Sequence, residues 1–276
     1  MMNRINAKTF LYGVLGHPVS HSLSPLMHNA AFDRIGFNGV YLAFDVREQD
    51  LAQAVSGIRA LGIRGASVTI PHKIHVMEYL DEVDETAFKI GAVNTIVNRD
   101  GHLYGYNSDC LGAMRALREK TEIRGKKVVM AGAGGAARAI GFGILEEGGD
   151  LTILNHIREE GERLASDLGV EFYPLSEHVR HGCDILINTT PLGMTPNTDT
   201  MAVSREYLKK EMVVMDIVYN PLKTMLLKEA KAIGCTVVDG LAMFVYQGAS
   251  QFESWTGRKA PSDLMREVVL DALGRK

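Results

Sequence analysis

The stretch Val68–Lys73 (VTIPHK) places a lysine directly after an apolar run and a proline. The apolar residues are typical of a buried strand, and Pro71 ends it because proline has no backbone N–H for a sheet. Lys73 therefore stands where the chain leaves a sheet, which is the usual place for residues that do chemistry in α/β proteins. The alternative is a solvated lysine at the start of a helix over residues 72–80, since lysine is usually exposed.

A second motif with chemical meaning is the glycine-rich stretch Gly132–Ala137 (GAGGAA), which lies between an apolar strand pattern and a helical one. Glycine is needed where a tight turn requires unusual φ and a pyrophosphate must approach bare N–H groups at the positive end of a helix. The spacing G-x-G-G-x-A predicts a dinucleotide-binding turn. The alternative is a purely structural glycine turn in an α/β sheet.

The strand after this turn ends at Asn155, and the chain continues as NHIREE. An NAD site usually carries Asp or Glu here for the ribose 2′-OH, whereas an NADP site carries a base for the 2′-phosphate. Asn155 is neutral and Arg158 is a candidate base, but the two glutamates that follow would repel a phosphate that they faced. A solvated arginine at the start of a helix is the alternative.

The elements that must position these residues alternate between strand and helix. The first hundred residues predict a βαβ domain with a mainly parallel sheet and a terminal hairpin around the turn RDG. Ser24 and Pro25 predict the N-cap and the first position of a helix. From Lys126 onward, six further strand patterns predict a doubly wound, Rossmann-type sheet. The fold class is therefore α/β.

Composition limits the classes of function. A net charge of −3 and 46% hydrophobic residues are typical of an ordinary globular protein, with neither nucleic acid nor a membrane as partner. Three widely spaced cysteines argue against a disulfide framework and a zinc site and fit a cytoplasmic protein. The apolar run FLYGVLG is too short for a membrane span and predicts a strand. His72 and His75 have no third ligand nearby, so we expect surface histidines and no metal.

Several stretches together resemble the shikimate dehydrogenase family, in the family's order and over nearly the whole chain. They are HSLSP, VTIPHK, GAVNT, GYNSD, GAGGAARA, NTTPLGM, DIVYNP and GLAMFVYQ. The resemblance implies reversible hydride transfer between NADPH and 3-dehydroshikimate, which gives shikimate for aromatic amino-acid biosynthesis. It also implies a substrate-binding and catalytic domain at 1–109 and a dinucleotide-binding domain at 110–240, with C-terminal helices at 241–276 that pack back on the first domain.

The resemblance assigns roles to individual residues. Lys73 is the catalytic lysine and Asp109 its partner carboxylate. The residues that bind substrate are Ser22, Ser24, Thr69, Asn94, Tyr219 and Gln247. Those that bind the cofactor are Gly132, Ala133, Gly134, Gly135, Ala136, Asn155, Ile217 and Gly240. Neutral hydroxyl and amide groups suit a small polyhydroxylated ring acid, because they supply donors and acceptors without net charge. Capping or turn roles for the serines, Asn94 and Asp109 are the alternatives.

The sequence departs from the family at the second strand of the cofactor domain. The family usually reads Asn-Arg-Thr, then two residues, then Lys or Arg, whereas these positions are Asn155, His156, Ile157 and Glu160 here. Both usual phosphate-binding bases are absent. We still expect NADP, with Arg158 and His156 as substitutes, and NAD remains possible.

Three other interpretations compete with this one. An NAD-preferring quinate/shikimate dehydrogenase is the first alternative. A methylenetetrahydrofolate dehydrogenase shares the two-domain plan, but a pterin does not need the serines of HSLSP. A dinucleotide sensor without catalysis would have no use for Lys73 and Asp109. The sequence is compatible with a monomer or a homodimer.

Overall fold

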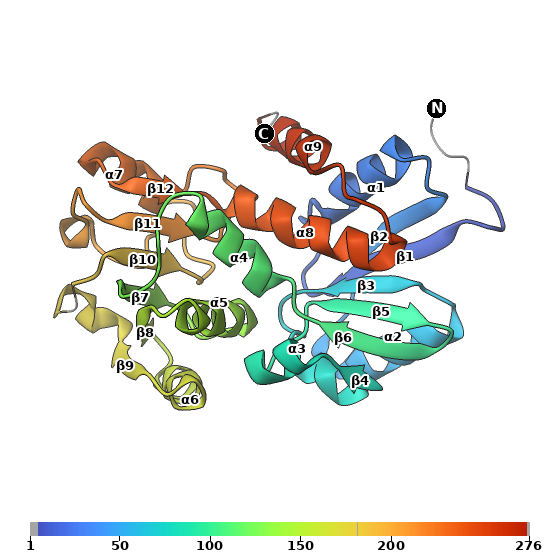
Figure 1. The fold of residues 1–276 in the computed structure, drawn as a ribbon, viewed down its shortest axis with the longest axis horizontal. Helices are drawn as coiled ribbons and strands as arrows, with labels where there is room; N and C mark the ends of the chain where they lie inside the picture. The colour runs from blue at the N-terminus through green and yellow to red at the C-terminus, as the bar shows by residue number, and fades with distance from the viewer. Residues whose placement is uncertain (1–4, 181, 275–276) are drawn as a thin grey trace. The chain divides into compact units, whose positions relative to one another are not determined.

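The computed structural model describes residues 5–180 and 182–274, which fall into two compact units (Figure 1). Unit 1 contains the residues up to Ser108 and those from Gln247 onward, and unit 2 is Asp109–Tyr246. The expected boundaries were 109/110 and 240/241. The second break falls inside the continuous helix α8 (Gly240–Thr256), so no change in the sequence pattern marks it.

Unit 1 is built on a six-stranded sheet with the order β2-β1-β3-β5-β6-β4. Its strands are β1 (Phe10–Gly16), β2 (Gly39–Asp45), β3 (Gly65–Val68), β4 (Glu82–Val83), β5 (Thr95–Arg99) and β6 (His102–Tyr106). Strand β1 pairs in parallel with β2 and β3, whereas β5 is antiparallel to β3 and forms the predicted hairpin with β6. The start of β5 therefore lies at the same edge of the sheet as the ends of β1 and β3.

Helices cover both faces of this sheet. They are α1 (Ser24–Arg34), η1 (Glu48–Asp50), α2 (Leu51–Ala60), η2 (His75–Tyr79), α3 (Glu85–Ile90), α9 (Ser262–Gly274) and the second half of α8. Helices α2 and α3 pack on one face over an aliphatic core. On the other face the rings of Phe32 from α1 and Trp255 from α8 pack against Tyr12, with centroids 5.2 and 5.5 Å away. Helices α1 and α9 lie side by side (Figure 1).

Two local predictions for unit 1 are wrong. Residues 72–80 form a turn and the short 3₁₀ helix η2 rather than an α-helix, because the Lys73 carbonyl accepts a hydrogen bond from the Val93 N–H, at 2.8 Å. Ser24 is the first residue of α1 rather than its N-cap. Leu23 takes the cap position, and its apolar side chain makes no cap hydrogen bond.

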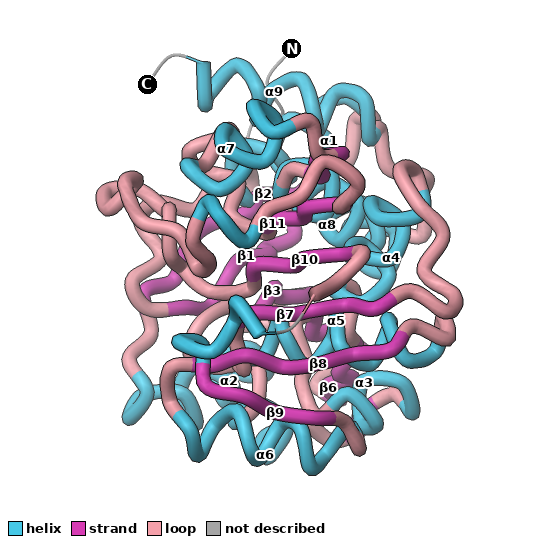
Figure 2. Tube along the Cα trace, turned by 90° about the vertical axis from the view of Figure 1, so that its left-hand side faces the viewer, coloured by secondary structure: helices cyan, strands magenta, loops and turns pink. Residues whose placement is uncertain are grey.

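Unit 2 has the predicted doubly wound sheet, with all of its strand pairs parallel and the order β12-β11-β10-β7-β8-β9. Its strands are β7 (Lys127–Ala131), β8 (Asp150–Asn155), β9 (Glu171–Pro174), β10 (Ile185–Asn188), β11 (Val213–Asp216) and β12 (Thr236–Val238). Figure 2 shows β11, β10, β7, β8 and β9 side by side in this order. The strand order reverses between β7 and β10, and dinucleotides bind at such a switch point.

Helices on both faces complete unit 2. They are α4 (Asp109–Arg118), α5 (Gly135–Glu146), α6 (Arg158–Leu168), η3 (Leu175–Arg180), η4 (Arg205–Tyr207), α7 (Met225–Ile233) and the first half of α8. Residues of α4, α5 and α6 pack into one core, and residues of α7 and η4 pack into the other. Met243 and Phe244 of α8 are both buried.

Candidate active site

Candidate residues from distant parts of the sequence meet at one edge of the unit 1 sheet. Ser22 and Ser24 follow β1, Thr69 and Lys73 follow β3, and Asn94 precedes the antiparallel β5. The Thr69 N–H donates to the Leu15 carbonyl at the end of β1, 2.9 Å away, which fixes the start of the loop. The topology therefore gathers hydroxyl, amide and ammonium groups at the edge where parallel α/β sheets place their ligands.

Lys73 is half-buried. Its backbone is anchored by the bond that its carbonyl accepts from Val93. This anchor ties the loop after β3 to the segment that leads into β5. The ammonium group thus projects from a backbone position that the sheet defines, which favours a chemical role over a surface one.

Asn94 is buried, and its side chain is held from several sides. Its Oδ1 accepts from the Thr95 hydroxyl at 2.7 Å and from the Ser108 N–H at 2.8 Å, while its Nδ2 donates to the Ser108 hydroxyl at 3.0 Å. The Val68 N–H donates to its carbonyl at 2.8 Å. A side-chain amide held this firmly has one orientation in which to meet a ligand.

The two serines of HSLSP differ in their surroundings. Ser22 is partly exposed, and its hydroxyl accepts from the Ser24 N–H at 3.2 Å. Ser24 is buried, and Tyr41 is fully buried, with its hydroxyl donating to that of Ser67 at 2.6 Å. Burial raises the pKa of Tyr41 far above its usual range, more than its hydrogen bonds lower it. Tyr41 therefore stays neutral and acts only as a hydrogen-bonding group.

The glycine-rich turn in unit 2 has the geometry that the sequence predicts. Strand β7 ends at Ala131, and Gly132 follows with φ of 116°, a value that side chains disfavour. A Cβ at Gly132 would overlap the Thr189 hydroxyl. Gly134 is exposed, with nothing within 4 Å of its would-be Cβ, and α5 begins one residue later. The turn thus exposes bare backbone before the N–H groups of a helix N-terminus.

The predicted phosphate-binding residues are less available than expected. Asn155 is buried, and its Nδ2 donates to the Ile157 carbonyl at 3.0 Å and toward Glu160 at 3.4 Å. Arg158 forms an ion pair with Glu162, 2.8 Å long, along the exposed face of α6. His156 is exposed, and with Asn155 it lines a pocket of about 590 Å³. The other residues of that pocket are Pro174, Leu175, Ser176, Met201, Ala202, Val203 and Ser204.

A buried carboxylate that the sequence analysis missed organises the switch point of unit 2. Asp216 ends β11 and accepts from Thr224 at 2.6 Å, from Asn188 at 3.0 Å and from the Val218 N–H at 3.1 Å. Burial raises the pKa of Asp216 to about 6, although the three hydrogen bonds lower it. Asp216 lies in the stretch DIVYNP and Asn188 in the stretch NTTPLGM. These two stretches were the signal in the sequence that could have pointed to the buried carboxylate.

This network fixes the loop that carries two candidate residues. Ile217 and Tyr219 follow Asp216 directly, and the Tyr219 ring stacks on Phe244, with centroids 4.3 Å apart. A Cβ at Gly240 would overlap the Ile217 carbonyl, so only glycine fits there. The predicted cofactor residues Ile217 and Gly240 thus lie in contact with each other.

Asp109, Tyr219 and the cofactor residues belong to unit 2, whereas Lys73 and the other substrate residues belong to unit 1. Asp109 is buried as the first residue of α4, directly after Ser108, and Gln247 is the first residue of the unit 1 part of α8. The pairing of Lys73 with Asp109 therefore stays a prediction.

The histidines next to Lys73 were predicted to lie at the surface, and this is wrong for one of them. His72 is buried, and its Nε2 lies 2.7 Å from the Val46 carbonyl, whereas His75 is exposed. Over residues 5–180 and 182–274, no three His, Cys, Asp or Glu side chains are grouped so that they could hold a metal ion. The same ranges contain no helix that is both long and apolar enough to cross a membrane.

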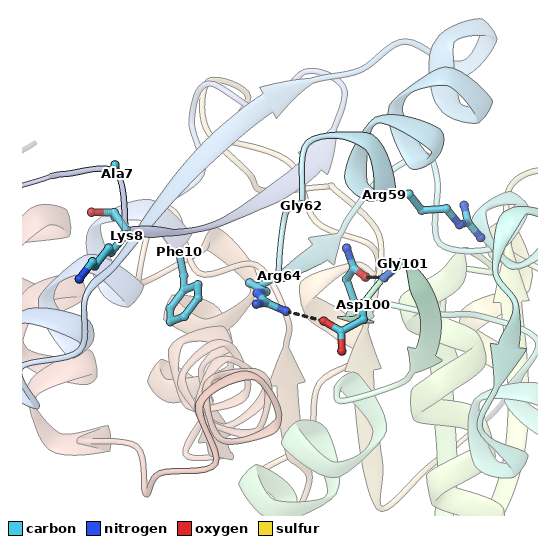
Figure 3. Close-up of a pocket in the computed structure, with 10 residues that line it drawn as sticks. Ala7, Lys8, Phe10, Arg59, Gly62, Arg64, Asp100 and Gly101 are labelled. Carbon is cyan, nitrogen blue, oxygen red and sulfur yellow. Dashed lines mark hydrogen bonds and ion pairs between the residues drawn. The ribbon is translucent and has the colours of Figure 1, made fainter.

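A further pocket lies at the opposite edge of the unit 1 sheet, where β1 and β3 begin (Figure 3). Arg64 turns toward Asp100, 3.4 Å away, and lies over the Phe10 ring, whereas the side chain of Arg59 extends away from them. Arg59 pairs with Asp81 at 2.9 Å. Both arginines that line this pocket are therefore paired with a carboxylate.

Comparison with known proteins agrees with this arrangement. Residues 14–96 match the family model of the shikimate dehydrogenase substrate-binding domain, and residues 240–270 match that of the shikimate 5′-dehydrogenase C-terminal domain. A shikimate dehydrogenase (NADP(+)) of Methanocaldococcus jannaschii is 46% identical over 280 residues, which cover 98% of this chain and 99% of the relative. The chain belongs to the shikimate dehydrogenase family.

Solved structures of shikimate dehydrogenases have the same fold. One in complex with NADP+ is 46% identical and superposes with a TM-score of 0.93 over 99% of both chains. Another, from Thermus thermophilus in complex with NADP(H) and shikimate, is 35% identical, with a TM-score of 0.88 over 96% of this chain and 100% of the other. Shikimate dehydrogenases thus share with this chain the substrate-type and Rossmann-type units described above.

Proposed function

We propose that this protein is an NADP-dependent shikimate dehydrogenase, which interconverts shikimate and 3-dehydroshikimate in aromatic amino-acid biosynthesis. The observation that carries the proposal is the edge of the unit 1 sheet, where residues with neutral polar side chains and one lysine follow or precede neighbouring strands. Ser22 and Ser24 come after β1, Thr69 and Lys73 after β3, and Asn94 stands directly before β5. The relatives of the chain carry this activity in their names.

The residues of unit 2 fit a dinucleotide. Gly134 has nothing within 4 Å of its would-be Cβ, and the turn precedes α5 at the switch point of the sheet. We assign Gly132–Ala136 to the pyrophosphate, Asn155 to the adenosine ribose, and Ile217 and Gly240 to the nicotinamide end. When bound, NADP accepts a hydride from shikimate or supplies one to 3-dehydroshikimate.

The proton of the reaction is the task of Lys73 and Asp109. When shikimate is oxidised, a hydride leaves the carbon that bears the reacting hydroxyl, and the hydroxyl proton must leave with it. Lys73 takes this proton in oxidation and returns it to the carbonyl oxygen in reduction. We assign Asp109 as the partner carboxylate of this lysine.

The other polar residues hold the substrate in position. Hydroxyls of Ser22, Ser24 and Thr69, the amide of Asn94 and that of Gln247 bind the ring hydroxyls and the carboxylate, and Tyr219 borders the pocket. An analogue that lacks one hydroxyl would leave the groups that bind this hydroxyl unpaired. Such unpaired buried groups are costly, and they make the site selective for the fully hydroxylated ring.

An NAD-preferring quinate/shikimate dehydrogenase is the second candidate. The observation that favours it is the pairing of Arg158 with Glu162, together with Glu160 near Asn155. These carboxylates weaken the grip on a 2′-phosphate. Quinate would need the same hydroxyl contacts, so the unit 1 residues alone do not separate the two.

The deciding experiment follows nicotinamide absorbance with shikimate or quinate and with NADP or NAD. We expect the highest kcat/KM for shikimate with NADP. A higher value with quinate and NAD would support the second candidate, and no turnover with any pair would refute both. We further propose a cytoplasmic location, in line with the reduced thiols of Cys110, Cys183 and Cys235, and a monomer or homodimer.

A further inference from the structure

A chain of hydrogen bonds inside unit 1 reaches one of the proposed substrate residues. The Tyr41 hydroxyl donates to Ser67 at 2.6 Å, Ser67 donates to Gln251 Oε1 at 2.8 Å, and Gln251 Nε2 donates to the Asn94 carbonyl and to the Thr95 hydroxyl at 3.0 and 3.1 Å. Each of these residues is at most 6% exposed. Gln251 lies at the centre of the chain.

The direction of these bonds follows from one fixed acceptor. A backbone carbonyl can only accept, so the Gln251 amide must turn its Nε2 toward Asn94 and its Oε1 toward Ser67. Ser67 then has to donate, because Oε1 has no hydrogen. The orientation of one buried amide thus decides the orientation of its neighbours.

At one end of this chain of hydrogen bonds, the orientation of the Gln251 amide affects the bonds of the Asn94 side chain. The Thr95 hydroxyl accepts from Gln251, so it donates its own hydrogen to Asn94 Oδ1, at 2.7 Å. The Ser108 N–H donates to the same oxygen. With Oδ1 committed, the end of Asn94 left for a ligand is Nδ2, whose second hydrogen is a donor.

At the other end the chain reaches Tyr41. Ser67 accepts from Tyr41, so the Tyr41 hydroxyl gives its only hydrogen away. Toward any other neighbour, the Tyr41 oxygen can therefore only accept a hydrogen bond.

We propose that Gln251 is a positioning residue, which acts through Thr95 to help hold Asn94 as a hydrogen-bond donor toward the substrate. The inference rests on the proposed function, since it assigns a polarity to one of the substrate contacts. A ring oxygen that accepts from Asn94 Nδ2 satisfies this polarity. Gln251 itself does not touch the substrate.

The first test replaces Gln251 by methionine, which has a similar length and no amide. Loss of a neutral hydrogen bond in the chain should raise KM for shikimate about three- to tenfold. The KM for NADP should stay unchanged. Phe252→Leu is the matched control, because it perturbs the adjacent buried residue of α8 and leaves the hydrogen bonds intact. It should lower the melting temperature without changing KM for shikimate.

The second test uses the relay residue Thr95. Thr95→Val keeps the shape and removes the hydroxyl, so it should raise KM for shikimate by a factor similar to that of Gln251→Met. Thr95→Ser keeps the hydroxyl and should restore wild-type KM. In the Thr95→Val background, Gln251→Met should add little, because the connection to Asn94 is already broken.

The outcomes separate this inference from the proposed function. If wild type turns over no shikimate, the proposed function fails. If wild type is active but Gln251→Met and Thr95→Val leave KM for shikimate unchanged, or if their effects multiply in the double variant, Gln251 is a structural residue only. Should Gln251→Met fail to fold, Thr95→Val against Thr95→Ser decides alone.

Discussion

The two units form their candidate sites from different chemical groups, side chains in unit 1 and mainly backbone in unit 2. In unit 1 the site consists of side chains, and buried residues such as Asn94 are held by hydrogen bonds to several neighbours. In unit 2 it consists largely of backbone, and Gly132 and Gly240 contribute by having no side chain. The difference follows from the partners: a polyhydroxylated ring needs directed donors and acceptors, whereas a pyrophosphate needs bare N–H groups. Unit 1 should therefore fail when side chains are removed, and unit 2 when they are added.

The largest effect is expected at the proton-transfer residue of unit 1. Lys73→Ala should lower kcat by about 10²- to 10⁴-fold, the usual contribution of a general acid or base. Shikimate should still bind, because the lysine's role is expressed mainly in the transition state. Steady-state kinetics and calorimetric titration measure the two quantities. Lys89→Ala is the control, since Lys89 is exposed and pairs with Glu85 along α3; a rise in KM with intact kcat would make Lys73 a binding residue.

The opposite kind of change should disable unit 2. Gly132→Ala places a Cβ against the Thr189 hydroxyl at a residue with φ of 116°, so the turn must deform. We expect NADP affinity to fall by about five- to 150-fold, given a strain of roughly 1–3 kcal/mol. Shikimate affinity should not change. Gly57→Ala in α2 is the control, because a Cβ there meets nothing within 4 Å. Unchanged NADP binding would mean that the turn is structural only.

These expectations were within reach of the sequence because their signals are local. The glycines follow a strand within a few residues, and the alternating pattern was enough for the doubly wound sheet. A tertiary contact overrode one local pattern: the Val93 N–H binds the Lys73 carbonyl, and residues 72–80 do not form the predicted α-helix. Such contacts have no sequence signature, because their partners lie far apart in the chain.

The same reason explains why the Gln251 chain was missed. Ser67 and Gln251 are 184 positions apart, and a glutamine in the middle of a helix pattern reads as a surface residue. Asp216 was missed although its stretch DIVYNP was recognised, since nothing local shows that Asn188 and Thr224 bind it. The residues that position a site are harder to find than those that form it.

The two units also differ in the charge of their buried polar groups, and pH should separate them. The chain around Gln251 is neutral, whereas Asp216 carries a carboxyl whose pKa burial raises to about 6. A folded-state pKa above the unfolded value means that the native state holds its proton longer. The contribution of Asp216 to stability is therefore full below about pH 4 and is lost as pH rises to about 6.

Asp216→Asn should remove this dependence. The free energy of unfolding of wild type relative to the variant should fall by up to about 3 kcal/mol between pH 4 and 6, and stay constant above pH 7. Urea titrations of both proteins across this range measure it. Gln251→Met provides the comparison from unit 1, because its effect on stability should not change with pH. Parallel pH profiles for wild type and Asp216→Asn would show that the carboxyl does not titrate there.

The smallest effects concern the edge of unit 2 where side chains, not backbone, must recognise the cofactor. A 2′-phosphate needs a cation, yet Arg158 is paired with Glu162 on an exposed face, and such pairs are weak enough to open. Arg158→Ala should therefore lower the ratio of kcat/KM for NADP over NAD by only about two- to fivefold. Glu160→Arg should raise it, because it removes a carboxylate near Asn155 and adds a guanidinium. Arg163→Ala, farther along α6, is the control. If the ratio does not change in either variant, backbone N–H groups or His156 bind the phosphate. In the first case, unit 2 recognises the cofactor through its main chain at this edge too.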